Sequence, residues 1–327
     1  MKAGVERGAN STSPKRESFC ISVWPHRLAV VTVCATFPLL FIGGLVTGKG
    51  AGLAVPDWPT TFGYNMFLYP WSQMVGGIFY EHSHRLAGSF VGLCTILLAL
   101  ALWLKEPRRW LRWLGLGALA MVIAQGILGG LRVVLLENTL AIIHASFAQA
   151  FFAFVAGLAL FTSEEWRRGH PEQPSLAIDD GGKLLRLGII TTALIYMQIV
   201  FGAVLRHTGE RLDAHLLFAG LVVVHVFLIV QRVTKFYSNQ PRLLRPAGIL
   251  GTLLAVQLLL GLGSYLGKYT TLLRMPAEGV VYITTIHLIV GALMLVTGLI
   301  LTLRVFRLSQ PVTISEARGF LREKATV

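Results

Sequence analysis

Residues 280–303 read VVYITTIHLIVGALMLVTGLILTL, a run without a single charged side chain. A helix needs about 20 apolar residues to cross a hydrocarbon core roughly 30 Å thick, and this run is long enough to do so. Because unpaired backbone groups are costly in lipid, such a run is expected to be a helix rather than a strand. The stretch therefore predicts a membrane-spanning helix.

Similar apolar runs precede it, at residues 28–47, 84–104, 111–131, 139–162, 184–205, 213–231 and 247–266. The chain has 327 residues, of which 54% are hydrophobic and 14% are charged. Soluble domains usually carry about 25% charged residues, so this composition excludes a water-soluble globule. The predicted fold class is an all-α integral membrane protein with eight transmembrane helices.

The distribution of basic residues predicts the orientation of the chain. Of the 29 Lys and Arg residues, 22 lie in the two tails and in the connections after the second, fourth and sixth runs. By the positive-inside rule, both termini are cytoplasmic. The net charge of +13 is thus explained by topology and lipid headgroups, and a nucleic-acid partner is not expected. The short polar amino terminus favours a multi-pass protein of a bacterial inner membrane.

A glutamine is followed four residues later by a glycine in the third, fifth and seventh runs, and the first run ends in a glycine pair. These residues are Gln125 and Gly129, Gln198 and Gly202, Gln257 and Gly261, and Gly43-Gly44. The repeat predicts two pseudo-symmetric four-helix bundles.

The predicted organisation has five parts. They are a cytoplasmic tail (1–27), a first half (28–162) with a long outer loop (48–80), a cytoplasmic linker (163–183), a second half (184–305) and a cytoplasmic tail (306–327). A loop as long as 48–80 is usually functional, and its many aromatic residues either form an interfacial belt or cover an opening into the membrane.

Four of the nine histidines share a context, because each lies in the outer half of an even-numbered span with a small residue four positions later. They are His84 with Gly88, His144 with Ala148, His215 with Ala219, and His287 with Gly291. Residues four apart share one helix face, so a flat macrocycle held by the histidine would lie over the small residue. Imidazole is a common axial ligand of haem iron, and the four histidines permit two haems. Hydrogen bonds between helices are the alternative role.

Glu81 precedes His84 by three residues and Arg85 by four, which places the three side chains on one helix face. A carboxylate beside a bound macrocycle can act as a base, a proton relay or a stabiliser of positive charge. The alternative is a helix amino-terminal cap that pairs with Arg85. His82 points away from His84 and, like His207 and His225, is assigned no role.

In these features the chain resembles the haem A synthases, eight-helix membrane enzymes of terminal-oxidase assembly. The resemblance runs from about residue 28 to 305. It rests on Gly43-Gly44, on Pro56-Asp57-Trp58-Pro59, on Glu81-x-x-His84-Arg85, and on His144, His215 and His287 in order. No single motif is specific, but the ordered combination is.

The resemblance implies a membrane oxidoreductase that oxidises a CH3 group of haem O to a formyl group, giving haem A. It also implies that His84 and His144 hold the substrate haem, with Glu81 as the catalytic residue. His215 and His287 would hold a permanent haem b cofactor. Arginines expected on the outer side are candidates for contacts with haem propionates, namely Arg85, Arg132, Arg206 and Arg211.

One branch of the family carries a cysteine pair in the first outer loop, and residues 48–80 contain no cysteine. The electron acceptor is therefore unidentified. The farnesyltransferase that makes haem O is an expected partner. Whether the chain forms a homo-oligomer is left open. The histidines alone also fit a dihaem cytochrome b-like electron-transfer protein. A haem transporter or chaperone without catalysis is a further alternative.

Overall fold

The computed structural model describes residues 22–168 and 178–309. Within them, eight helices are long and apolar enough to span a membrane, which confirms the predicted all-α, eight-span fold. These helices are α1 (Trp24–Gly48), α2 (Gly76–Lys105), α3 (Arg109–Leu135), α4 (Asn138–Thr162), α6 (Ile178–Thr208), α7 (Leu212–Phe236), α8 (Pro241–Tyr269) and α9 (Ala277–Leu308). The short elements are α5 (Glu164–Arg168) and the 3-10 turns η1 (Met66–Leu68) and η2 (Trp71–Gln73).

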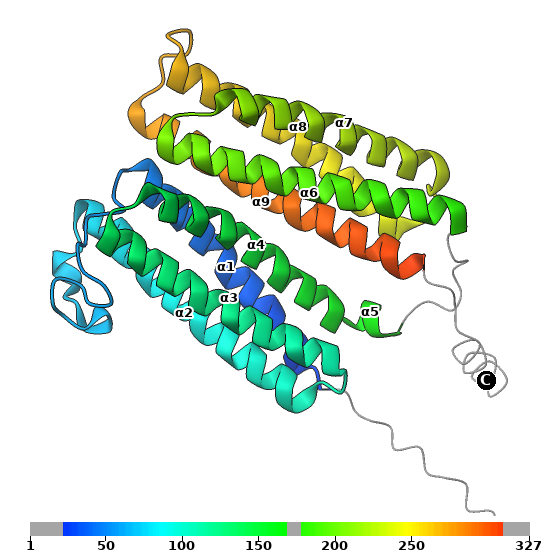
Figure 1. The fold of residues 1–327 in the computed structure, drawn as a ribbon, viewed down its shortest axis with the longest axis horizontal. Coiled ribbons are helices and arrows are strands. Elements are labelled where there is room, and N and C mark those ends of the chain that lie inside the picture. The colour runs from blue at the N-terminus through cyan, green and yellow to red at the C-terminus, as the bar shows by residue number, and fades with distance from the viewer. Residues whose placement is uncertain (1–21, 169–177, 310–327) are drawn as a thin grey trace, which may run out of the picture.

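The helices pack as two groups that follow the chain (Figure 1). In the first group α1, α2, α3 and α4 contact one another in order and α4 returns to α1, and α6 to α9 repeat this pattern. Helix α4 contacts both α6 and α9, and α1 also contacts α9. A cluster of buried residues from α1, α4 and α9 joins the groups, formed by Leu40, Phe152, Ile289 and Ala292.

Close approach of α1 to α9 depends on Gly44. A Cβ atom at this position would lie 2.7 Å from Thr285 Cγ2, so only glycine allows the observed contact. Small residues permit such approach in membranes, where burial from water does not drive helix association. Arg206 of α6 strengthens the contact, because its Nη2 donates to the Gly44 carbonyl oxygen at 2.7 Å.

The start of α2 differs from the sequence prediction. The expected helix began at residue 84 and the outer loop ended at residue 80, whereas α2 begins at Gly76 and the loop covers residues 49–75. Glu81 and His82 lie inside the helix and are buried, with 4% and 1% of their surface exposed. Their partners come from the loop, so the polar run that seemed to mark a loop end belongs to a buried helix face.

The first turn of α1 and the last turn of α9 lie at the same end of the bundle, opposite the loop 49–75 (Figure 1). The predicted tails (1–27 and 306–327) lie mostly outside the described residues, as does the centre of the predicted linker, at 169–177. Their cytoplasmic placement and the division into halves stay predictions.

Candidate functional site

The four histidines with a small residue four positions later come together as two pairs. His84 of α2 faces His144 of α4, with ring centroids 6.3 Å apart and ring planes at 81°. His215 of α7 faces His287 of α9, again with ring centroids 6.3 Å apart and planes at 67°. The structure therefore brings together the two pairs that the resemblance implied.

The spacing within each pair suits one metal ion between two imidazoles. At a typical metal–imidazole distance of about 2.0 Å, two rings on opposite sides of an ion have centres roughly 6 Å apart. The four Nδ1 atoms are buried and have no hydrogen-bond partner. Buried polar atoms are rarely left unpaired in a folded protein, so these rings fit a role in binding a ligand. The open space above Gly88 fits the macrocycle expected over that residue.

Each histidine ring packs against a glycine of the preceding helix. A Cβ atom would lie 3.0 to 3.2 Å from the Cε1 atom of the facing imidazole at each of four glycines. These histidine-facing glycines are Gly43 against His84, Gly129 against His144, Gly202 against His215, and Gly261 against His287. The repeat seen in the sequence thus has a structural reason, since a side chain there would push the imidazole aside.

The glutamines of the repeat distinguish the two pairs. Gln198 Nε2 lies 3.3 Å from His215 Nε2, and Gln257 Nε2 lies 3.4 Å from His287 Nε2. In the first pair, Gln125 instead donates to the backbone oxygen of His144, at 3.2 Å. Among the described residues, the glutamine amides therefore contact the ring nitrogens of the second histidine pair but not those of the first.

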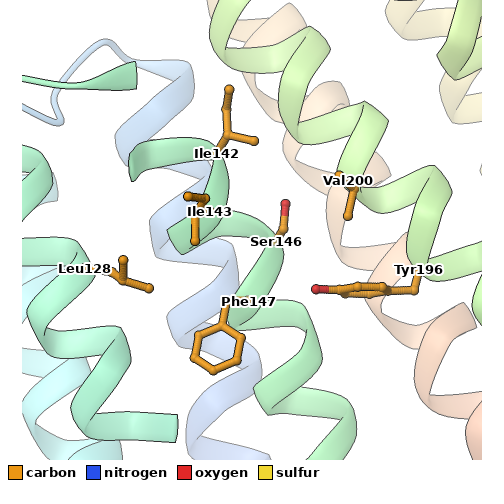
Figure 2. Close-up of a pocket in the computed structure, with 7 residues that line it drawn as sticks. All are labelled: Leu128, Ile142, Ile143, Ser146, Phe147, Tyr196 and Val200. Atoms are coloured by element: carbon orange, nitrogen blue, oxygen red, sulfur yellow. The ribbon is translucent and has the colours of Figure 1, made fainter. Parts of the chain in front are cut away.

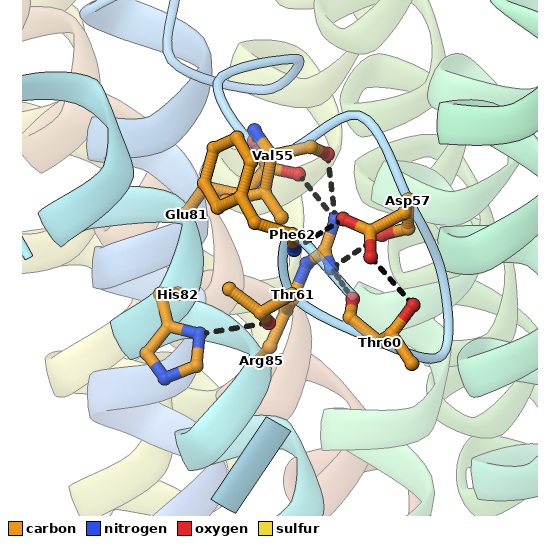
Figure 3. A network of polar contacts seen from close by, with 8 residues as sticks. All are labelled: Val55, Asp57, Thr60, Thr61, Phe62, Glu81, His82 and Arg85. Carbon is orange, nitrogen blue, oxygen red and sulfur yellow. Dashed lines mark hydrogen bonds and ion pairs between the residues drawn. The ribbon is translucent and has the colours of Figure 1, made fainter. Parts of the chain in front are cut away.

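Glu81 and Arg85 fasten the outer loop to α2 (Figure 3). Glu81 Oε2 accepts a hydrogen bond from Val55 N at 2.9 Å, and Glu81 Oε1 accepts one from Arg85 Nη2 at 2.9 Å. Arg85 also donates to the backbone oxygens of Val55, Asp57 and Thr60. The expected pair of Glu81 with Arg85 is present, but Glu81 is not a helix cap, because the residue before α2 is Val75.

Asp57 organises the turn of the loop next to this pair. Its carboxylate accepts hydrogen bonds from the Thr60 hydroxyl and from the backbone N–H group of Phe62 (Figure 3). It also accepts one from the backbone N–H group of Gly63. Burial alone would raise the pKa of Asp57, but these hydrogen bonds from Gly63, Thr60 and Phe62 lower it to about 2. The turn is therefore built around a charged carboxylate.

His82 fastens the loop from the other side of α2. Its Nδ1 lies 3.2 Å from Thr61 Oγ1 (Figure 3). Its ring centroid lies 5.1 Å from that of Tyr69. This contact gives His82 a structural role that the sequence did not indicate. His225 contacts the backbone oxygen of Leu221 in its own helix, at 2.8 Å.

The four candidate arginines lie in different surroundings. Both Nη atoms of Arg85 are used by the loop and Glu81, and Arg206 donates to Gly44, Thr284 and Thr285 while its Nε is unpaired. The Arg132 guanidinium packs on Gly52 and makes no hydrogen bond to a described residue. The Arg211 side chain is 60% exposed beside Asp213.

Sequence reasoning missed the contact between Trp58 and α3. The indole of Trp58 packs directly on Gly130, next to the glycine that faces His144. The loop therefore reaches the helix that supports one histidine of the first pair. The adjacent glycines 129 and 130 were the only signal in the sequence, and they did not reveal which side chains they face.

Two comparisons bear on the family. A family model described as cytochrome oxidase assembly protein matches residues 64–215. A curated heme A synthase from Shouchella clausii (strain KSM-K16) is 31% identical to the chain over 190 residues, which are 57% of this chain. The chain is therefore similar, over about half of its length, to cytochrome oxidase assembly proteins and to a heme A synthase. The chain spans 60% of the length of that relative.

The region matched by the family model contains most of the site. Glu81, His84, His144 and His215 lie within residues 64–215, whereas His287 lies beyond them. The match to the cytochrome oxidase assembly model therefore covers the first histidine pair fully. For the second pair it covers one residue, and the other is identified by its position opposite His215.

Proposed function

We propose that the protein oxidises a methyl group of haem O to a formyl group and so makes haem A for cytochrome oxidase assembly. The observation that carries the proposal is the position of Glu81, one helical turn before His84 and held by Val55 and Arg85. Removing electrons from a methyl carbon on a conjugated ring builds positive charge there. A carboxylate fixed beside it stabilises that charge.

The two histidine pairs have separate roles in this proposal. His84 and His144 hold the substrate, haem O, close to Glu81. His215 and His287 hold a haem b, which supplies one-electron transfer when bound. Within the described part of the chain, glutamine amides lie near the ring nitrogens of the second pair and not of the first. This chemical difference between the two sites supports the division of roles.

Arg132 and Arg206 are the best candidates for binding haem propionates. The guanidinium of Arg132 makes no hydrogen bond to a described residue, and the Arg206 Nε is buried and unpaired. Charge-assisted hydrogen bonds from arginine to carboxylates are strong, so free donors at these positions can bind propionates. Arg85 is less suited, because its Nη atoms are used by the loop and Glu81.

The environment follows from the same assignment. The loop 49–75 would face the periplasm of a bacterial inner membrane, both termini would be cytoplasmic, and the halves would be related by pseudo-symmetry. Haem O would arrive from the farnesyltransferase that makes it, and water would supply the formyl oxygen. The electrons would pass to an acceptor that is unidentified.

The test is to incubate the purified full-length chain in lipid vesicles with haem O and an artificial one-electron acceptor, then extract and separate the haems. Haem A is expected, together with haem b that stays in the protein. Haem b alone at two per chain, with haem O left unconverted, would reject the proposal.

A dihaem cytochrome b-like electron-transfer protein is the second candidate, because both pairs have the same 6.3 Å spacing. It predicts two unmodified haems and gives Glu81 no role beyond fastening the loop. A haem chaperone would release haem from the first pair reversibly without forming haem A. The same extraction separates the three functions.

A further inference from the structure

The outer loop exposes large apolar side chains outside the membrane-spanning helices. Phe67, Leu68, Trp71 and Val75 lie in or beside the 3-10 turns η1 and η2, and each is between 64% and 78% exposed. We call these four residues the loop patch. Large exposed apolar patches are rare on surfaces that face water, and they usually mark a site of interaction with a protein or a membrane. The loop patch therefore requires a partner.

The local structure holds the loop patch outward. Tyr69 lies between the two turns and is buried, and its ring centroid is 5.1 Å from that of His82 in α2. The side chain of Asn65 accepts a hydrogen bond from Phe67 N at 2.9 Å and so caps η1. Because Tyr69 is fixed against the protein, the exposed side chains around it cannot turn inward without breaking these contacts.

The loop patch has almost no charge near it. Asp57 is the single charged residue between positions 50 and 75, and its carboxylate is already bonded within the loop. By contrast, each of the three shorter outer connections carries an exposed charged side chain, namely Glu137, Arg211 and Arg274. Charge complementarity selects protein partners and anionic headgroups, and the loop patch offers none. Its composition fits a partner that is recognised by apolar contact.

The depth of the loop patch along α2 matches the lipid headgroups. At 1.5 Å per residue, α2 rises about 40 Å from Gly76 to Trp103, and a bilayer with its headgroups is about 40–45 Å thick. Trp103 and Trp113 are both exposed, and their ring centroids lie 6.0 Å apart. Exposed tryptophans at one depth are typical of a membrane interface. With these rings in one headgroup layer, the start of α2 and the adjoining loop patch lie in the other.

The loop also extends in the direction where lipid is expected. In Figure 1 it projects sideways from the start of α2, away from the group formed by α6 to α9. Apolar side chains exposed on the spans need only lipid to cover them, as in the groove between α3, α4 and α6 that Leu128 and Phe147 help to line (Figure 2). Phe79, which is half exposed in the first turn of α2, joins the loop patch to such a lipid-facing surface.

We propose that the loop patch inserts into the headgroup layer of the membrane and fastens the outer loop to the lipid surface. Interfacial segments bury apolar side chains about 5–10 Å into the boundary between headgroups and acyl chains. The same loop donates the Val55 N–H to Glu81, so lipid provides a second attachment for the loop in addition to α2. The attachment is apolar and needs no anionic lipid. It does not depend on the proposed oxidation of haem O.

The experiment places an environment-sensitive fluorophore on the loop patch. The full-length chain carries Cys20→Ser, Cys34→Ser and Cys94→Ala, and the label is attached at Leu68→Cys in phosphatidylcholine vesicles. A nitroxide high on the lipid acyl chain should cause a loss of emission, whereas iodide in the water should not. The same label at Glu210→Cys, in an exposed and charged outer connection, is the matched control and should give the reverse result.

Two results at Leu68→Cys would overturn the proposal. Quenching by iodide and not by the nitroxide lipid would show that the loop patch faces water, which leaves a protein as its partner. Quenching by lipid that requires added anionic phosphatidylglycerol would show that charge rather than apolar contact holds the loop. Equal quenching with and without phosphatidylglycerol is the expected result.

Trp71→Phe provides a measurement without cysteine replacement. The emission that this variant loses relative to the wild type belongs to Trp71. That difference should be quenched in vesicles of phosphatidylcholine brominated near the headgroup end of its acyl chains. A difference that the brominated lipid leaves unchanged would overturn the proposal even if the labelled chain does not fold.

Discussion

The ring of His144 packs against the backbone of Gly129 so closely that a Cβ atom at this position would lie 3.1 Å from His144 Cε1. Gly129→Ala is therefore expected to push the imidazole out of line with His84. Overpacking of this kind typically costs about 1–3 kcal/mol. In protein that has been loaded with haem O, haem bound by two imidazoles should fall by about half, since the first of the two pairs is affected. Absorption spectra of the reduced protein, normalised to protein concentration, measure this.

Gly126→Ala is the matched control, because it lies one turn earlier in α3 and a Cβ atom there meets nothing within 4 Å. It should keep full haem content. If Gly129→Ala also keeps full haem content, the contact between this glycine and His144 has no part in binding haem.

His287 and His225 provide a second comparison between intramembrane histidines. His287→Ala removes one member of the second pair and should abolish binding of the resident haem b while leaving haem O at the first pair. His225→Ala should change neither, because its ring bonds only the backbone of its own helix. Haem extraction after purification distinguishes the results, and haem b retained in His287→Ala would contradict the assignment.

Glu81→Gln tests the charge of the carboxylate. The amide oxygen still accepts a hydrogen bond from Val55 or Arg85, so the loop should stay in place, but the negative charge is lost. Removing one such electrostatic group typically lowers the rate about 10²- to 10³-fold, and haem A formation should fall by that amount with haem O still bound.

Glu278→Gln is the control for this variant. It breaks the ion pair with Lys49 at a carboxylate whose side chain is 73% exposed, and it should leave haem A formation unchanged. Limited proteolysis of residues 49–75 checks that the loop of Glu81→Gln is intact. Undiminished haem A formation with an intact loop would reject the catalytic role.

The loop should respond to acid through Asp57. Its pKa is lowered from 3.8 to about 2, so the folded turn is stabilised by the charged form. That stabilisation is fully present above pH 3.8 and is lost as the pH falls through about 2. Pepsin cleavage within residues 49–75 should rise over this interval in the wild type and show no such step in Asp57→Asn. An identical pH profile in both proteins would contradict this origin.

The fold was largely predictable because only a few backbone structures can span the hydrocarbon core of a membrane. Length and hydropathy alone indicated eight helices, and the small residue four positions after His84, His144, His215 and His287 separated these histidines from the other five. The start of α2 was wrong by eight residues, since the helix begins at Gly76 rather than at residue 84. The polar side chains of Glu81 and His82 are satisfied by a loop whose position the sequence does not show.

The contacts around the site were less predictable, because they join residues distant in the chain. The sequence revealed the repeat of Gly129, Gly202 and Gly261 but not that an imidazole packs on each. Nor did it reveal the contact of Trp58 with Gly130 or of Arg206 with the backbone of α1. Such contacts depend on how two helices rotate against each other, which local patterns do not determine.

The bond between Glu81 and the Val55 amide has a consequence for the order of events. The carboxylate and the loop share this bond, so any outward swing of residues 55–61 strips the carboxylate of one of its two partners. A bulky substrate that enters beneath the loop would need the loop to be open, whereas the carboxylate is held in position only when the loop is closed. The proposed oxidation would then proceed only when the loop is closed, which would protect the reacting haem from side reactions at the membrane surface.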